Sequence, residues 1–217
     1  MKIKSLLILV LFTTHYSLKA QQSVQFKFEN GDFLFQDLDC GALCDAIESV
    51  TEGVNGKDFS HIGLVYISND STYVIEASGN DVHLTPLKEF LYRNVDNHGN
   101  PKIVVARLRK PYRKLNKSAL DFALRQIGTP YDDEYLYNNG RYYCSELIYD
   151  SYKFANHNQP LFELQPMTFK DPVTGKIMKA WKDYYDQLGM SVPEGKPGCN
   201  PGGISTSPYL EIVKSFY

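Results

Sequence analysis

Apolar residues along the chain alternate or cluster in runs whose lengths predict short strands and amphipathic helices. Runs of strand length, bounded by polar or glycine-containing turns, lie at 33–35, 62–67, 72–77 and 102–108. Apolar residues at helical spacing lie at 43–50, 85–91, 118–127, 144–154 and 179–189. A short polar turn joins the second and third strands, which predicts a β-hairpin.

This pattern predicts one α+β domain over residues 21–217, with a small, mostly antiparallel sheet packed against helices. A chain of 217 residues is long enough to bury a sizeable core in a single domain. The stretch 193–208 is rich in Gly and Pro and predicts a long ordered loop or flap. We find neither an internal repeat nor an interdomain linker.

The first twenty residues have the pattern of a secretory signal peptide. Lys2 and Lys4 form a basic start, an apolar run follows at 6–12, and Ala20 is a small residue before Gln21. The apolar run is too short to span a membrane, and the remaining chain has no second long apolar segment. We therefore expect cleavage near Ala20, a periplasmic or extracellular protein, and no transmembrane segment in the mature chain.

Charge changes this picture little. Three of the 23 basic residues and none of the 25 acidic residues lie in the first twenty, so the mature chain carries a net charge of −5. No basic stripe with interleaved aromatic residues is present, which argues against nucleic-acid binding. The sixteen Tyr and twelve Phe suit a well-filled core and an aromatic-lined groove.

Cys144 is the strongest candidate for chemistry, because a polar loop meets a predicted helix at this residue. Free backbone N–H groups and the positive end of the helix dipole gather at such a junction, and both favour a thiolate over a thiol. The sequence therefore predicts a nucleophile. The alternative is a small hydrophobic residue that only packs near a helix start.

The other cysteines are Cys40, Cys44 and Cys199. In an oxidising compartment, one disulfide among these three would leave one thiol over. A bridge between Cys40 and Cys44 within one helical turn is awkward, so we consider a bridge from Cys199 to either of them. No His lies near these cysteines at ligand spacing, so we expect neither a metal site nor a cofactor.

A cysteine nucleophile needs a base, and four histidines follow the predicted signal segment. His98 lies in a polar turn, His157 lies beyond the far end of the Cys144 helix, and His83 has no clear orientation. His61 opens an apolar strand, so a sheet would hold its backbone. His61 is therefore the predicted base.

The hairpin supplies an orienting group for His61. A turn centred between Ser68 and Asn69 would place His61 directly opposite Glu76, with their Cβ atoms roughly 5 Å apart. Glu76 lies inside an apolar strand, where an unpaired carboxylate would be costly, and an imidazole beside it would remove that cost. A structural His–Glu pair at a strand edge is the alternative interpretation.

At these residues the chain resembles the NlpC-type papain-like cysteine hydrolases, in the circularly permuted branch typified by the YiiX/YebB-like amidases. The histidine strand precedes the cysteine helix, which is the permuted order. The segments around 40–44 and the Gly/Pro-rich tail depart from the pattern, so the substrate is not carried over. The matching segments are Gly31-Asp32-Phe33-Leu34-Phe35-Gln36, Phe59-Ser60-His61-Ile62-Gly63, Val74-Ile75-Glu76-Ala77, Thr85-Pro86-Leu87, Gly128-Thr129-Pro130-Tyr131-Asp132 and Tyr143-Cys144-Ser145-Glu146-Leu147.

The resemblance implies a circularly permuted papain-like fold and a Cys144–His61–Glu76 triad, the three residues that the pattern also selects. It implies an amidase or peptidase that forms a thioester acyl-enzyme on a peptide, amide or acyl substrate, for example a cell-wall peptide. Tyr131 and Gln36 are further candidates for lining the substrate site; a turn-packing tyrosine and a strand-end amide are their alternative roles.

Two other functions remain open. Because permuted members resemble the lecithin–retinol acyltransferase group, one is a lipid-directed acyl hydrolase or acyltransferase. The other is a non-catalytic binding domain that keeps the fold. That last function would predict the loss of a triad residue, and all three are present.

Overall fold

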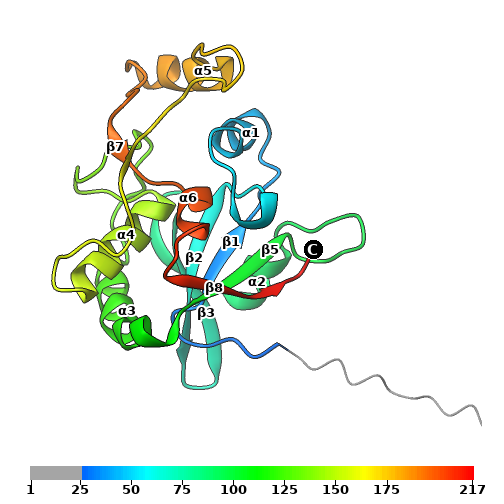
Figure 1. Cartoon of the computed structure of the whole chain (residues 1–217), viewed down its shortest axis with the longest axis vertical. Coiled ribbons are helices and arrows are strands. Elements are labelled where there is room, and N and C mark those ends of the chain that lie inside the picture. Colours follow the sequence, from blue (N-terminus) through cyan, green and yellow to red (C-terminus); the bar gives the residue numbers. More distant parts are fainter. Residues whose placement is uncertain (1–25) are drawn as a thin grey trace, which may run out of the picture.

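The computed structural model describes residues 26–217, so the predicted signal segment 1–20 lies outside the described residues. This part of the chain forms an antiparallel sheet in the order β4-β3-β2-β1-β5-β8 (Figure 1). Sequence-adjacent strands β2, β3 and β4 form a meander, whereas the C-terminal β8 returns to the far edge beside β5. The strands are β1 (Phe33–Gln36), β2 (His61–Ser68), β3 (Ser71–Ser78), β4 (Asp81–Pro86), β5 (Ile103–Leu108) and β8 (Leu210–Ser215).

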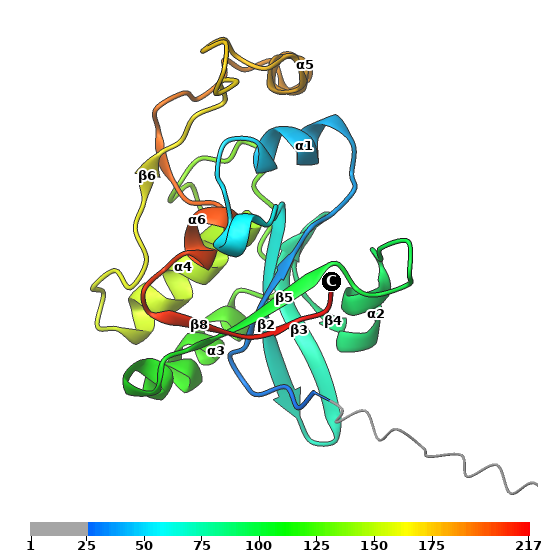
Figure 2. The same cartoon turned by 45° about the vertical axis from the view of Figure 1, so that its right-hand side comes forward.

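Helices cover both faces of the sheet. Helices α3 (Asn116–Arg125) and α4 (Cys144–Ala155) pack on one face, and the short α2 (Leu87–Tyr92) packs on the other (Figure 2). Two 3-10 turns, η1 (Val54–Gly56) and η2 (Lys110–Leu115), lie in the connections. None of the helices in this part of the chain combines the length and the apolar character needed to cross a bilayer.

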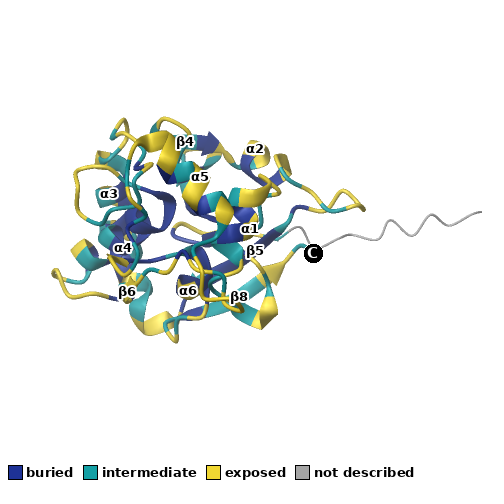
Figure 3. Ribbon diagram, turned by 90° about the horizontal axis from the view of Figure 1, so that it is seen from above, coloured by how far each residue is buried: buried dark blue, intermediate teal, exposed yellow. Residues whose placement is uncertain are grey.

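The central strands are apolar at nearly every position because both faces of the sheet are buried (Figure 3). Phe33 and Phe35 face α4 and pack with Leu147, whereas Leu34 faces α2 and packs with Phe90. All five side chains are fully buried. Side-chain alternation along a strand therefore assigns each residue to one of two cores.

A second, smaller layer lies above one end of the sheet. Helices α1 (Ala42–Glu48) and α5 (Lys179–Leu188) pack together around the buried Phe169 and Trp181. Two connecting segments, paired through β6 (Gln165–Pro166) and β7 (Pro197–Gly198), run between α5 and the main core (Figure 1). The chain then forms α6 (Pro201–Ser205) beside α4 before entering β8.

The predicted fold class is confirmed, and most predicted elements lie within a few residues of the observed ones. The Gly/Pro-rich stretch differs, because it contains α6 rather than loop alone. The Asn200 side chain accepts a hydrogen bond from the Gly203 N–H, and Pro201 occupies the first turn, so a capped start compensates for weak helix formers. Strand β4 was not predicted either, because its residues beside Val82 are mostly polar.

The sequence left the disulfide pairing open, and the bridge that is present is the one that sequence spacing made awkward. Cys40 and Cys44 are bonded to each other, with their Cα atoms 5.4 Å apart, and Cys199 is a free thiol. Cys40 lies before the first residue of α1, and Gly41 between them has φ 81°, which only glycine adopts easily. The chain thus turns back at Gly41, and the bridge is not confined to one helical turn.

Candidate active site

Cys144 is the first residue of α4, as predicted. Tyr143 precedes it in an extended conformation (φ −88°, ψ 168°), so the backbone N–H groups of the first turn have no partner within the helix. Leu147 and Ile148 are fully buried against the sheet, which holds the helix start in place. The Cys144 side chain is almost completely buried, with 6% of its surface exposed.

Cys144 lines a cavity of about 790 Å³ between the sheet core and the α1–α5 layer. The walls are largely aromatic and apolar, and they include Tyr131, Phe162 and Trp181. Among the described residues that line it, Glu163 is the only charged side chain, and it is exposed. The cavity therefore presents a thiol to a volume whose walls are more apolar than polar and hold no buried charge among the described residues.

His61 and Glu76 lie behind Cys144 and form a buried pair. His61 Nε2 and Glu76 Oε2 are 2.6 Å apart; 5% of the surface of His61 is exposed and none of that of Glu76. His61 is the first residue of β2, so its ring projects from the end of the strand. Phe90 packs beside the ring, with centroids 5.9 Å apart, and limits its movement.

The register that led to this pair was wrong by two residues, although the contact itself is present. Leu64 pairs with Ile75, and the two-residue turn is Asn69-Asp70, with Asn69 in the left-handed region at φ 51°. Glu76 is consequently diagonal to His61 rather than opposite it. A shift of two residues keeps both side chains on the same face of the sheet, whereas a shift of one would have separated them.

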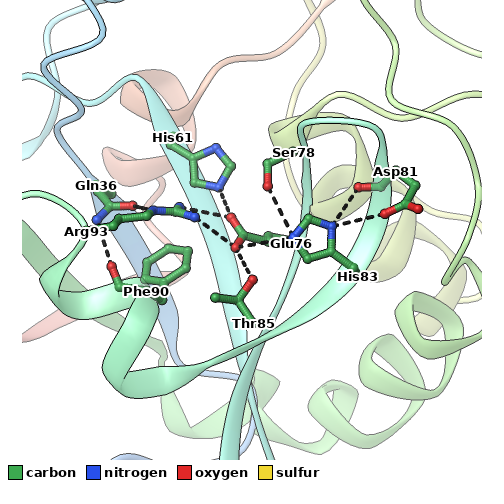
Figure 4. A network of polar contacts seen from close by, with 9 residues as sticks. All are labelled: Gln36, His61, Glu76, Ser78, Asp81, His83, Thr85, Phe90 and Arg93. Carbon is green, nitrogen blue, oxygen red and sulfur yellow. Dashed lines mark hydrogen bonds and ion pairs between the residues drawn. The ribbon is translucent and has the colours of Figure 1, made fainter.

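Glu76 has partners for both of its oxygens (Figure 4). Besides His61, the Thr85 hydroxyl donates to Oε1, and Arg93 Nη1 and Nη2 donate to Oε1 and Oε2, each at 2.9 Å. Burial raises the pKa of Glu76, but the hydrogen bonds and positive charges of His61 and Arg93 outweigh burial and lower it well below its usual range. The carboxylate is therefore ionised throughout the neutral range.

Arg93 was not among the predicted site residues. It follows the last residue of α2, its guanidinium lies 4.2 Å from the centre of the Phe90 ring, and its Nε donates to Gln36 Oε1 at 2.8 Å (Figure 4). The buried Glu76 was a signal that a cation lies nearby. Sequence spacing alone did not identify which cation, because Arg93 is held in place by tertiary packing.

The remaining partner of His61 is Cys144. Burial lowers the pKa of His61, but hydrogen bonds with Cys144 and Glu76, together with their negative charges, outweigh it and raise the pKa to about 9. Since Nε2 is bonded to Glu76, Nδ1 is the ring nitrogen free to exchange a proton with the thiol. His61 is thereby poised to form an imidazolium beside a thiolate.

The two residues predicted to line the substrate site lie in different places. Tyr131 lines the cavity, and its hydroxyl lies 3.5 Å from that of Tyr135. Gln36 does not line the cavity: it is fully buried, its Nε2 donates to the Phe90 carbonyl, and its Oε1 accepts from Arg93. Gln36 therefore holds Arg93 in place through a hydrogen bond. Its position does not match the predicted role of lining the substrate site.

The other histidines are separated from the thiol. His83 pairs directly across β3 and β4 with Glu76, but its Nε2 is 3.9 Å from Glu76 Oε1 and its Nδ1 contacts Asp81. Its side chain is 39% exposed on the outer side of the carboxylate. His98 is exposed in a turn, and His157 lies beyond the C-terminal end of α4, as predicted.

Comparisons with known proteins agree with this geometry. The model of a family described as "permuted papain-like amidase enzyme, YaeF/YiiX, C92 family" matches residues 27–214. The uncharacterized protein YiiX of Escherichia coli K12 is 29% identical over 187 residues, which cover 85% of each chain. The crystal structure of the metalloprotein YiiX from Escherichia coli O157:H7 has a TM-score of 0.69 at 26% identity, over 86% of this chain and 97% of that one.

Because that neighbour is described as a metalloprotein, we examined the metal-ligating side chains of this chain. Within residues 26–217, no group of three or more His, Cys, Asp and Glu side chains is arranged to hold a metal ion. His61 Nε2 is already bonded to Glu76, and Cys40 and Cys44 are joined in a disulfide. These residues do not fit a metal site, and the chemistry below uses none.

The family match covers nearly all of the described chain, and the histidine strand precedes the cysteine helix, as expected for the permuted order. The chain therefore belongs to the YaeF/YiiX (C92) family of permuted papain-like amidases and is a cysteine hydrolase of the amidase type.

Proposed function

We propose that the protein hydrolyses an amide bond with a Cys144–His61–Glu76 triad through a thioester acyl-enzyme. The observation that supports this most strongly is the buried pair in which His61 Nε2 lies 2.6 Å from Glu76 Oε2, behind Cys144 at the start of α4. A nucleophile, a base and an orienting carboxylate in this order are what covalent acyl transfer needs.

In the first half-reaction the proton of the Cys144 thiol resides on His61, and Cys144 Sγ attacks the carbonyl carbon. A tetrahedral intermediate forms, and its oxyanion lies at the start of α4, where the Cys144 backbone N–H has no partner within the helix. His61 then gives its proton to the leaving nitrogen, and the carbon–nitrogen bond breaks. Water, deprotonated by His61, attacks the thioester and releases the acid with regeneration of the thiol.

Tyr131 is suited to donate a second hydrogen bond to the oxyanion. It lines the cavity beside Cys144. Burial, followed by the charges of Tyr135 and Cys144, raises the pKa of the Tyr131 hydroxyl well above its usual range. The hydroxyl therefore keeps its proton at neutral pH and remains a donor when negative charge develops on the substrate.

The lining of the cavity supports the proposal that the preferred substrate carries an uncharged, apolar acyl group. Its walls hold no cationic side chain among the described residues, so a carboxylate in the cavity would be desolvated without a partner. The same lining favours a second candidate function over the hydrolysis of cell-wall peptides, which are rich in acidic groups. That function is a lipid-directed acyl hydrolase or acyltransferase, with an acyl chain in the cavity.

We further propose that the enzyme works in an oxidising, exported compartment after cleavage near Ala20. The basic and apolar pattern of the first twenty residues supports this, and the Cys40–Cys44 disulfide is of the kind that persists outside the cytosol. The N-terminus of the secreted protein is then expected to be Gln21, which N-terminal sequencing of the exported fraction will test.

The triad is tested by alkylation in a Cys199→Ala background, in which Cys144 is the single free thiol among the described residues. We expect iodoacetamide to label Cys144 rapidly near neutral pH, and His61→Ala to slow labelling by about 100-fold or more. Slow labelling that does not depend on His61 contradicts the mechanism.

Substrate class is tested with the purified protein, using Cys144→Ala as the blank. One arm compares amides that share a leaving group but carry either an apolar acyl chain or a carboxylate-bearing γ-glutamyl group. A second arm uses peptidoglycan fragments and acyl-lipid esters. Turnover of the apolar amide supports the leading proposal, turnover of esters alone supports the lipid-directed function, and turnover of acidic peptides alone contradicts the apolar preference.

A further inference from the structure

The buried carboxylate of Glu76 creates a difficulty for a catalytic histidine. Glu76 has no exposed surface, so its negative charge has to be balanced by positive groups within the protein. If protonated His61 were the only such group, each loss of the His61 proton would leave a buried charge unbalanced. A general acid–base group has to gain and lose its proton readily in every cycle.

Arg93 supplies a second positive charge that does not titrate. Its guanidinium forms two parallel hydrogen bonds with Glu76, both at 2.9 Å, a bidentate geometry that only arginine offers. Arginine remains protonated at all pH values that the protein experiences. The charge of Glu76 is therefore balanced whether His61 is an imidazolium or a neutral imidazole.

The position of Arg93 is itself fixed on three sides (Figure 4). Its Nε donates to Gln36 Oε1 at 2.8 Å, and Gln36 Nε2 donates in turn to the Phe90 carbonyl at 3.0 Å. The Phe90 ring lies under the guanidinium and also beside His61. The end of α2 thus holds both Glu76 and the imidazole at set positions.

We propose that Arg93 is a positioning residue of this site: it fixes Glu76 and balances its charge, so that His61 can release its proton during turnover. The proposal rests on the triad proposed above and extends it to a residue that does not touch the substrate. Gln36 supports Arg93 in this role, which accounts for a buried amide at the end of β1.

The titratable groups that face His61 and Glu76 come from three elements. Cys144 faces His61 from α4, Arg93 faces Glu76 from the end of α2, and His83 faces Glu76 from β4 at 3.9 Å. His83 is in turn paired with Asp81. A test of Arg93 therefore has to separate its effect from those of Cys144 and His83.

The experiment measures the ionisation of the His61 ring by NMR in full-length protein carrying Cys144→Ala, which removes the thiol from the titration. His83→Gln identifies the His83 resonance and is expected to leave the His61 midpoint in place. Adding Arg93→Gln is expected to raise the His61 midpoint by about 1 to 3 pH units, because one balancing charge is lost. Adding Arg93→Lys keeps the charge and is expected to raise the His61 midpoint by less than half as much.

Arg107 provides a matched control on the same sheet. It forms a similar bidentate pair with the fully buried Asp32, at 2.6 and 2.9 Å, at the other end of β1 from Gln36. Arg107→Gln is expected to lower thermal stability without moving the His61 midpoint. Equal shifts in Arg93→Gln and Arg107→Gln would overturn the proposal, as would an unchanged midpoint in a folded Arg93→Gln protein.

Turnover in the Cys144-containing protein completes the test. Arg93→Gln is expected to lower kcat more than KM changes, and in a Glu76→Gln background it is expected to have little further effect, because Arg93 acts through Glu76. If Arg93→Gln does not fold, Arg93→Lys decides: kcat reduced about 10-fold supports the role of the bidentate contact, and parental kcat contradicts it. The NMR readout needs no substrate, so loss of the proposed hydrolase activity and loss of the Arg93 effect remain distinguishable.

Discussion

Cys144 and Cys199 are two free cysteines that share burial, cavity and position near a helix start but differ in their neighbouring side chains. Both are buried, with 6% and 7% of their surfaces exposed, both line the same cavity, and each lies at or just before the start of a helix. Burial and helix position are therefore shared. We therefore expect the neighbouring side chains, rather than burial or helix position, to decide which thiol reacts.

The neighbours of Cys199 are hydroxyl groups. Its backbone N–H donates to the Tyr143 hydroxyl at 3.2 Å, its carbonyl accepts from Ser145 Oγ at 2.9 Å, and its sulfur lies 3.9 Å from the Tyr143 hydroxyl. Burial raises the pKa of the Cys199 thiol to about 12, and hydrogen bonds with Ser145 and Tyr143 offset only part of this. Cys144 instead has the His61 ring as a neighbour, the base that we propose for it. Cys199 thus has a structural role in joining α6 to the start of α4.

The largest effect expected from this comparison is on turnover. Cys144→Ala should lower kcat/KM by at least about 10,000-fold, because the covalent step loses its nucleophile. Cys199→Ala should change it by no more than a few-fold, since the two shorter hydrogen bonds of Cys199 are made by its backbone and the sulfur contact with the Tyr143 hydroxyl is 3.9 Å long. Hydrolysis rates of the two variants with one amide substrate make the measurement. Comparable losses in both folded variants would mean that the two thiols act together.

The next largest difference expected between the two thiols is in the pH dependence of their alkylation. The raised pKa of His61, about 9, keeps the imidazolium present below that pH, so Cys144 has a positive charge beside it throughout the neutral range. A thiol with a pKa of about 12 is almost entirely protonated there. At about pH 7, Cys144 should be labelled at least about 1,000-fold faster than Cys199.

Peptide mass mapping after timed exposure to iodoacetamide measures both rates in one sample. The rate at Cys144 should change again above about pH 9, where His61 loses its proton and the ion pair is lost. Labelling of both cysteines at equal rates would show that burial alone governs access to the cavity.

Tyr131 allows a test of the proposed contacts between the substrate and the site around Cys144. Tyr131→Phe should lower kcat about 100-fold if the hydroxyl donates to the oxyanion, because the charge in the intermediate would lose one donor. Tyr135→Phe is the matched control, since this hydroxyl lies in the same cavity 3.5 Å from that of Tyr131. Steady-state kinetics should show a small effect for Tyr135→Phe, and equal effects would assign both tyrosines to packing.

The smallest expected effect is on stability and comes from a substitution of Glu146. It is 1% exposed, its Oε1 accepts from the Asn138 N–H at 2.8 Å, and burial raises its pKa to about 8. A carboxyl with a raised pKa binds its proton more tightly in the folded state, so its contribution to stability is lost as pH rises from about 4.5 to about 8. Glu146→Gln should therefore match the wild type near pH 5 and unfold several degrees higher near pH 9, at about 2–4 °C per kcal/mol.

Thermal unfolding at the two pH values measures this difference. At about pH 9, where Glu146 is ionised, the same substitution removes a negative charge that helps to raise the pKa of Cys199, so alkylation of Cys199 should become slightly faster. A variant that is less stable than the wild type at both pH values would show that Glu146 is needed as an ionised acceptor.

Much of the fold was predictable because the relevant signals are local. The helix from Cys144 and the strand from His61 follow from apolar spacing and begin at the predicted residues or one residue earlier. Strand β4 was missed because its backbone pairing with β3 does not depend on an apolar pattern of its own. The Cys40–Cys44 bond was missed because it depends on the backbone conformation of Gly41.

The amino-acid sequence by itself determined which residues are the candidates for the chemistry: a cysteine at a helix start, a histidine at a strand start and a carboxylate inside an apolar strand. Only the tertiary structure decided how they are combined. The diagonal contact between His61 and Glu76, the pairing of Glu76 with Arg93, and the different neighbours of Cys144 and Cys199 depend on contacts between separate elements, at sequence separations of 15, 17 and 56 residues. The physical reason is that proton affinity depends on charges and hydrogen-bond partners within a few ångströms, and only folding brings those partners together.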